Sequence, residues 1–251
     1  MKVIFVGAGP GDPELLTVKA ERLLRGARCC IYAGSLVAET IVGLLPADAE
    51  LHDSASLSLE QIVDIVKAAR ERGIDVVRLH SGDPSIYGAI GEQMARLDEL
   101  GIPYEVVPGV SSFQAAAAAL KIELTVPEIS QTIILTRASG RTPLPESQEF
   151  ERLARIKATL CIFLSIHKIE EIARTLAVEY GVDAPAAVVF HASRPDQLVI
   201  RGTLADIARR TRESGIEKTA LVIVGNAVAR ADRESKLYDK SFTHGYREAQ
   251  P

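Results

Sequence analysis

The sequence predicts an α/β protein made of two α/β domains of similar size, and three observations lead to this prediction. Short apolar runs alternate with amphipathic segments of helical period along the chain, which is typical of successive strand and helix units. The 251 residues suffice for two domains of about 110–120 residues each. A proline-containing stretch interrupts the alternation near the middle. We therefore expect an N-terminal domain at 1–121, a linker at 122–130, a C-terminal domain at 131–229 and a polar C-terminal tail at 230–251.

The individual elements follow from this alternation. The apolar runs of the first half predict strands at 2–7, 28–32, 75–80 and 103–107, and its amphipathic segments predict helices at 13–25, 58–72, 86–100 and 111–120. The second half predicts strands at 132–136, 159–164, 186–190, 197–201 and 220–225, with helices at 148–156, 168–179 and 204–213. The tail is polar and mixed in charge, and we expect it to form a surface or dimer arm.

Composition and charge exclude several classes of protein. Hydrophobic residues make up 47% of the chain and charged residues 25%, which is ordinary for a protein with a packed core. The net charge of −4 gives no broad basic face, so no nucleic-acid partner is expected. The chain enters a strand at once without a secretion signal, and no apolar run reaches about 18–20 residues, the length that spans a bilayer. We expect a cytoplasmic protein without a membrane partner.

The cysteines and histidines predict no metal site. Cys29, Cys30 and Cys161 have no paired spacing, and we expect three reduced thiols in the core. The five histidines are scattered, and no group of cysteine, histidine and carboxylate residues has the spacing of metal ligands. A zinc enzyme is therefore disfavoured.

A glycine-rich turn, GAGPGDP at 7–13, follows the first expected strand. A dinucleotide fingerprint needs a third glycine where this chain has Asp12, and an acidic residue after the second strand, where it has AGS at 33–35. The Asp12 carboxylate would repel a pyrophosphate, and no Gly-Lys-Ser/Thr sequence of a P-loop is present. The turn therefore favours a nucleoside ligand without a phosphate, such as S-adenosylmethionine.

Two further turns, SGDP at 81–84 and PGVSS at 108–112, join a strand to a helix in the same half of the chain. Each Asp-Pro pair also suits a helix start, because the carboxylate caps free N–H groups and proline presets φ. Ligands of open α/β sheets gather at the carboxyl ends of the strands. Three such turns at one edge predict a ligand cleft there.

The same residues carry a resemblance to a known family. VGAGPGDPELLT at 6–17, SGDPSIYG at 81–88 and PGVSS at 108–112 resemble signatures of the tetrapyrrole methylase family, as do CIFLSIH at 161–167 and TALVIVGNAV at 219–228. Three blocks are similar to the branch that acts on precorrins in cobalamin biosynthesis: IYAGSLV at 31–37, HSGDPSIYGAI at 80–90 and PEISQTIILTRASGRTP at 127–143.

The resemblance implies an S-adenosylmethionine cleft between the two domains, a tetrapyrrole (precorrin) substrate beside it, and a homodimer. The implied reaction moves a methyl group to a ring carbon and leaves S-adenosylhomocysteine. The implied cofactor-binding residues are Pro10, Ser81, Gly82, Asp83, Ile86, Ser111, Ser112, Leu164, Ala192, Ala220 and Leu221. We expect Asp83 to hold the amino-acid or ribose end of the cofactor, because a carboxylate against the sulfonium would slow the transfer.

Such a substrate bears many carboxylates, which suit guanidinium groups. We therefore expect Arg137 and Arg141 to bind substrate, with a solvated or dimer-facing position as the alternative. Tyr32 and Tyr87 are candidates for the ring face, with a buried, hydrogen-bonded hydroxyl as the alternative. Family members that methylate uroporphyrinogen carry an aspartate where this chain has Ala33, so no catalytic residue is assigned and that substrate is disfavoured.

Three classes of function stay open. The first is the methyltransferase, either on a metal-free or on a cobalt-containing ring, or at a different ring carbon. The second is a nucleotide-dependent oxidoreductase, which the missing third glycine and the missing ribose acid disfavour. The third is a non-catalytic tetrapyrrole carrier, which would need no set of three cofactor turns.

Overall fold

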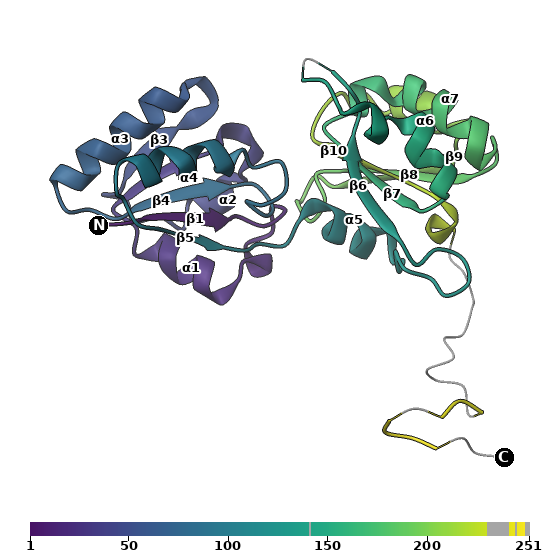
Figure 1. The fold of residues 1–251 in the computed structure, drawn as a ribbon, viewed down its shortest axis with the longest axis horizontal. Helices are drawn as coiled ribbons and strands as arrows, with labels where there is room; N and C mark the ends of the chain where they lie inside the picture. The colour runs from purple at the N-terminus through teal and green to yellow at the C-terminus, as the bar shows by residue number, and fades with distance from the viewer. Residues whose placement is uncertain (141, 230–240, 244, 249–251) are drawn as a thin grey trace. The chain divides into compact units, whose positions relative to one another are not determined.

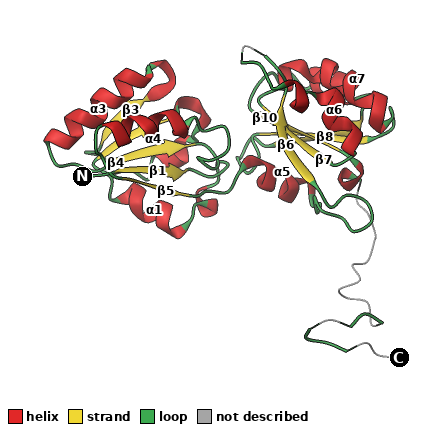
Figure 2. Cartoon of the chain, viewed as in Figure 1, coloured by secondary structure: helices red, strands yellow, loops and turns green. Residues whose placement is uncertain are grey.

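The computed structural model describes residues 1–140, 142–229, 241–243 and 245–248. The chain divides into two compact units, the first formed by 1–116 with 191–197 and the second by 117–190 with 198–251. Each unit contains one five-stranded sheet with helices (Figures 1 and 2), which confirms the expected α/β class. The expected linker falls within the second unit, and no sequence pattern marks 191–197 as part of the first. The expected domain bounds stay a prediction.

The first unit contains a sheet of five parallel strands in the order β3-β2-β4-β1-β5. Its strands are β1 (Val3–Gly7), β2 (Cys29–Tyr32), β3 (Glu50–Asp53), β4 (Val76–His80) and β5 (Tyr104–Val107). Strands β1 and β4 are buried along their whole length. Because all strands run parallel, their carboxyl ends meet at one edge, and the loops after β1, β4 and β5 come together there.

Helices cover both faces of this sheet. They are α1 (Val18–Arg25), α2 (Glu39–Val42), α3 (Leu59–Glu71) and α4 (Ile90–Glu99). Helix α5 (Ser112–Leu120) follows β5 and spans the division between the two units at Ala116 and Ala117. In Figure 1, α1 lies on one side of the sheet and α3 and α4 lie on the other. Side chains of β1 alternate between the two faces, so Val6 packs in the core cluster with Leu24 of α1, and Phe5 packs in the cluster with Val66 of α3.

The first unit differs from the expected elements in three places. Strand β3 and the short α2 were not predicted, because β3 reads Glu-Leu-His-Asp and lies at the edge of the sheet, where charged residues are common. The helix expected from residue 13 begins at Val18, because the Thr17 side chain caps it. The helix expected from residue 86 begins at Ile90, because the loop before it contains residues with positive φ.

The second unit contains a mixed sheet in the order β6-β7-β10-β8-β9, in which only β6 and β7 are parallel. Its strands are β6 (Ile133–Arg137), β7 (Thr159–Phe163), β8 (Pro185–Phe190), β9 (Leu198–Thr203) and β10 (Ala220–Val224). Its helices are α6 (Phe150–Leu153), α7 (Ile169–Tyr180) and α8 (Ile207–Glu213). All five strands expected in this half are present. One core cluster fills this unit and includes Leu160, Ile172 and Val222.

The three cysteines are free and buried, as expected. Burial raises the pKa of the Cys29 thiol to about 11 and those of Cys30 and Cys161 to about 12. Among the helices that the structure describes, none combines the length and the apolar character that crossing a membrane requires. Most of the expected tail, namely 230–240, 244 and 249–251, lies outside the described residues.

Candidate functional site

Three glycine-containing turns meet at the carboxyl edge of the parallel sheet. The first two are joined by an isolated antiparallel bridge, in which the Gly82 N–H donates to the Gly9 carbonyl at 2.8 Å and the Gly9 N–H donates to the Gly82 carbonyl at 3.2 Å. A Cβ atom added to Gly7 would lie 2.6 Å from the Gly109 nitrogen and 2.7 Å from the Gly82 oxygen. Only glycine fits such a close approach of three backbones. The structure therefore brings together the three turns that the sequence singled out.

Asp83 joins the second turn to the third. Its Oδ2 accepts a hydrogen bond from the Gly109 N–H at 2.9 Å, and its Oδ1 accepts from the Ser85 N–H at 2.8 Å and from the Ser85 hydroxyl. Burial alone would raise the pKa of this carboxyl, but the bonds from Ser85 and Gly109 outweigh burial and lower the pKa below its ordinary value. Asp83 therefore braces the site as a carboxylate. The helix-capping role expected from the sequence predicts the bond from Ser85, but no local pattern predicts the bond from Gly109.

The first turn is poorly suited to binding a phosphate group. The Ala8 N–H donates to the His80 carbonyl at 2.7 Å, and the Asp12 N–H donates to the Ser193 hydroxyl at 3.1 Å. The Asp12 carboxylate accepts from the Glu14 N–H at 2.9 Å and thereby places a negative charge at the start of the helical turn. An anion site at a helix N-terminus needs free N–H groups and no competing carboxylate. The turn fits a nucleoside that lacks a phosphate.

The other cofactor residues expected in the first unit lie on these turns or next to them. Pro10 and Ser111 are buried, while Ser81, Ile86 and Ser112 are half-buried. The Ser111 N–H donates to the Gln114 side chain at 2.9 Å, which fixes the start of α5. Ala192 is buried and precedes Ser193, the residue whose hydroxyl holds the first turn. The structure thus gathers these side chains at one edge.

The cofactor residues expected in the second unit lie where β7 ends and β10 begins. Leu164 follows β7 with a left-handed φ of 55°, and the residue is 62% exposed. A left-handed conformation costs a leucine about 1–2 kcal/mol, and such strain is concentrated at functional sites. Ala220 and Leu221 open β10, whose pairing with β7 begins only at Val222. The Leu221 side chain is buried, so only its backbone is available to a ligand.

The residues expected to bind the substrate differ in their surroundings. The Arg137 guanidinium donates to the carbonyls of Ala138 at 3.1 Å, Thr142 at 3.0 Å and Pro143 at 3.3 Å, and so holds the loop after β6. This bracing role was not predicted. Arg141 lies outside the described residues. Tyr87 lies between the second turn and α4, with 45% of its side chain exposed and a φ of 55°.

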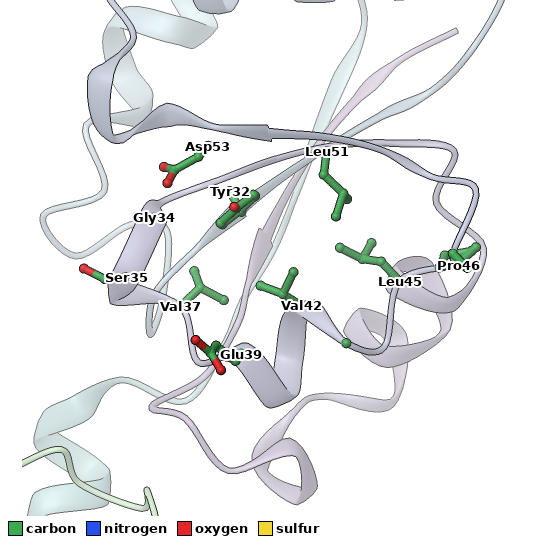
Figure 3. Close-up of a pocket in the computed structure, with 12 residues that line it drawn as sticks. Tyr32, Gly34, Ser35, Val37, Glu39, Val42, Leu45, Pro46, Leu51 and Asp53 are labelled. Carbon is green, nitrogen blue, oxygen red and sulfur yellow. The ribbon is translucent and has the colours of Figure 1, made fainter.

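Tyr32 lines a pocket of about 500 Å³ at the carboxyl ends of β2 and β3. Figure 3 shows Ser35, Glu39 and Asp53 at one end of this pocket and the apolar side chains Leu45, Pro46 and Leu51 at the other. The volume is within the range of small-molecule sites. Sequence reasoning missed the pocket, because β3 and α2, which form two of its walls, were not predicted.

One group of potential metal ligands is found among the described residues, formed by Cys29, Glu50 and His52, whose ligand atoms lie within 4.8 Å of one another. It was not expected, because β3 was missed. The Glu50 carboxylate is bonded to Arg72 at 2.6 Å and to His52 at 2.8 Å, and the bond from Arg72 lowers the pKa of Glu50. Both oxygens of the Glu50 carboxylate are thus already engaged, Oε2 by the Arg72 guanidinium and Oε1 by the His52 ring. We assign the group to an ion-pair cluster at the sheet edge.

Comparisons with known proteins point to one family. The sequence profile described as Tetrapyrrole (Corrin/Porphyrin) Methylases matches residues 2–208. The cobalt-precorrin-4 C(11)-methyltransferase of Methanocaldococcus jannaschii is 50% identical over 250 residues, which cover 99% of this chain and 96% of that protein. The precorrin-4 C(11)-methyltransferase of Pseudomonas aeruginosa is 49% identical over 248 residues, which cover 98% of this chain and 99% of that protein.

Solved structures resemble the whole fold as well. The structure of a cobalt precorrin-4 methyltransferase, a cobalamin biosynthetic enzyme, matches with a TM-score of 0.88 and 42% identity over 90% of this chain and 95% of that one. A uroporphyrin-III C-methyl transferase from Thermus thermophilus, complexed with S-adenyl homocysteine, matches with a TM-score of 0.78 and 32% identity over 91% of this chain and 99% of that one.

Proposed function

The chain belongs to the tetrapyrrole methylase family, and from this premise we propose that it transfers a methyl group from S-adenosylmethionine to C11 of precorrin-4. The products are precorrin-5 and S-adenosylhomocysteine, in the biosynthesis of cobalamin. The observation that carries this proposal is the 49–50% identity, over nearly the whole chain, to two C(11)-methyltransferases. One of these relatives acts on the cobalt-containing ring and the other on the metal-free ring, so the cobalt form of the substrate is the second candidate.

The three turns suit a cofactor without a phosphate, because the N–H groups of Gly9, Gly82 and Gly109 are already hydrogen-bonded and the Asp12 carboxylate disfavours a pyrophosphate. When bound, S-adenosylmethionine supplies a sulfonium methyl group to a carbon nucleophile. The proposed contacts come from Pro10, Ser81, Gly82, Ile86, Ser111, Ser112, Leu164 and Ala192, and from the backbone of Ala220 and Leu221. A carboxylate has about four lone-pair sites that can accept hydrogen bonds. Three of these sites on Asp83 accept the bonds that hold the turns together, and the fourth is proposed to accept a bond from a cofactor hydroxyl or amine.

The protein's contribution to such a transfer is mainly to position the two reactants and to exclude water. The apolar wall of the Tyr32 pocket suits an edge of the tetrapyrrole ring. We propose Tyr87, Arg137 and Arg141 as further substrate residues, with Arg137 acting through the loop that it braces. The expected homodimer and the cytoplasmic location are part of the same proposal and are supported by the family resemblance.

The reaction is tested by incubating the protein with S-adenosylmethionine and either precorrin-4 or cobalt-precorrin-4. We expect a product heavier by one methyl group, with the new methyl located at C11 by NMR. Calorimetry with S-adenosylhomocysteine and with NAD distinguishes a methyltransferase from a nucleotide-dependent oxidoreductase. Binding of NAD without binding of S-adenosylhomocysteine would overturn the proposal, and a methyl group at another ring carbon would reassign the substrate.

Replacing Leu164 by glycine is expected to weaken cofactor binding without weakening the fold. Glycine adopts the left-handed conformation freely, so the free energy of unfolding should stay equal or rise by up to about 1 kcal/mol. The lost side chain should lower the affinity for S-adenosylhomocysteine about tenfold, the effect of an uncovered apolar contact. Thermal unfolding and calorimetry measure the two quantities. Lys157→Gly is the control, since Lys157 is exposed and has a φ of 54°; equal affinities in both variants would remove Leu164 from the site.

A further inference from the structure

Arg78 lies in the middle of β4 and is only 6% exposed. Burying a guanidinium is costly unless the charge is paired, and no ion pair to Arg78 is found in the part of the chain that the structure describes. An apolar residue at this position would cost less to bury. Since the charge of Arg78 makes it costly to bury, we look for its role in the hydrogen bonds that its side chain makes.

Three hydrogen bonds link Ile31, Arg78, Gln93 and Ala89, and Arg78 donates two of them. Its Nη1 donates to the carbonyl of Ile31 at 3.2 Å, and its Nε donates to Oε1 of Gln93 at 3.0 Å. The Nε2 of Gln93 in turn donates to the carbonyl of Ala89 at 3.0 Å. Gln93 is 7% exposed, so this relay, Ile31–Arg78–Gln93–Ala89, is shielded from water over its central part. In such surroundings each bond is stronger than in water and fixes its partners firmly.

Both ends of the relay lie beside the proposed site. Ile31 precedes Tyr32, the pocket residue. Ala89 ends the loop that starts with the second turn, and it has a left-handed φ of 49°. In the same loop, a Cβ atom on Gly88 would overlap the carbonyl of Pro84, so the loop folds back on itself. Left-handed alanine and tyrosine residues are unfavourable by themselves, so the surrounding contacts must hold them in place.

We propose that Arg78 and Gln93 are positioning residues for the methyl transfer, because they fix the loop at 84–89 to the end of β2. The relay holds the second turn and the Tyr32 pocket at a constant spacing. Neither side chain contacts a reactant, since both are buried between the sheet and the helices α3 and α4, Gln93 being a residue of α4 itself. The expected effect on methyl transfer rests on the proposed function. The expected effect on the loop at 84–89 rests on the hydrogen bonds alone.

The decisive variant is Gln93→Glu. The carboxylate still accepts the bond from Arg78, and it now neutralises the buried charge, so the melting temperature should equal or exceed that of the wild type. The same carboxylate has no hydrogen to donate to the Ala89 carbonyl and repels it. We expect kcat for the methyl transfer to fall about tenfold with little change in the KM for precorrin-4. Amide hydrogen exchange at 84–89 should become faster than in the wild type.

Two further variants separate positioning from packing. The double variant Arg78→Met with Gln93→Met removes the buried charge and its partner together, so it should be about as stable as the wild type while its kcat is low. Gln148→Glu makes the same chemical change on an exposed residue of the second unit and should alter nothing. A Gln93→Glu protein with wild-type kcat and wild-type exchange at 84–89 would overturn the inference. If the wild type does not methylate precorrin-4 at all, the proposed function fails, and exchange at 84–89 still decides whether the relay holds the loop.

Discussion

Replacing Gly109 by alanine is expected to weaken cofactor binding strongly. The added Cβ would overlap the carbonyl oxygen of Gly82 and lie 2.9 Å from the Cα of Gly7. Because these are backbone atoms, no change of side-chain rotamer can relieve the overlap. The third turn would have to move away from the other two. Overpacking of this kind costs about 1–3 kcal/mol or more. We expect the affinity for S-adenosylhomocysteine, measured by calorimetry, to fall by about 100-fold.

Gly91→Ala is the matched control for this substitution. Gly91 is exposed near the start of α4, and a Cβ atom there would meet nothing within 4 Å. Alanine is the better helix former by about 0.5–1 kcal/mol, so this variant should bind like the wild type and melt slightly higher. A Gly109→Ala protein that folds and binds S-adenosylhomocysteine like Gly91→Ala would show that the contact between the turns does not form the cofactor site.

Asp83→Asn is expected to give the second large effect. An asparagine side chain has one acceptor oxygen and an NH₂ group, so it cannot accept bonds from both Gly109 and Ser85. After allowance for partial exposure, the lost bond is worth about 1–2 kcal/mol. The free energy of unfolding should fall by that amount at pH 7. The affinity for S-adenosylhomocysteine should fall at least about tenfold, because the second and third turns separate.

The pH dependence of this effect has a definite sign. The folded-state pKa of Asp83 lies below its ordinary value, so the carboxylate stabilises the fold above about pH 4, and this stabilisation is lost as the pH falls through the folded-state pKa. The stability difference between the wild type and Asp83→Asn should therefore shrink in urea titrations below about pH 4. Asp183→Asn, at an exposed residue of the second unit, serves as the control. A difference that stays constant down to pH 3 would contradict the bracing role.

Most of the sheet elements were predictable, because they are continuous apolar runs with local turn signals. The strands β1, β4, β7 and β10 are buried on both faces, and burial of this kind gives a strong pattern. The edge strand β3 was missed because none of its four residues is buried, so it carries no continuous apolar run. The delayed start of α4 was missed because Ala89 is a good helix former, and only tertiary contacts hold it in a left-handed conformation.

The candidate site was predictable only in part for the same reason. Glycines that are required by close backbone approach leave a mark in the sequence, so the three turns were found. The partners of long polar side chains leave no such mark. The bond from Gly109 to Asp83 spans 26 residues, and the relay through Arg78 to Ile31 spans 47. Likewise, the substrate-binding role of Arg137 expected from the sequence stays a prediction, and only the structure shows that its guanidinium also donates to the carbonyls of Thr142 and Pro143.

The burial of all three cysteines makes the native protein a convenient background for site-specific labelling. With a pKa of about 11 for Cys29 and about 12 for Cys30 and Cys161, at most about one thiol in 10,000 is ionised at neutral pH, and maleimides react with the thiolate. A cysteine introduced at exposed Gly91 and another at exposed Gln148 would be the only reactive handles. Fluorophores attached there would report on nucleoside binding in each unit without a competing signal from the native thiols.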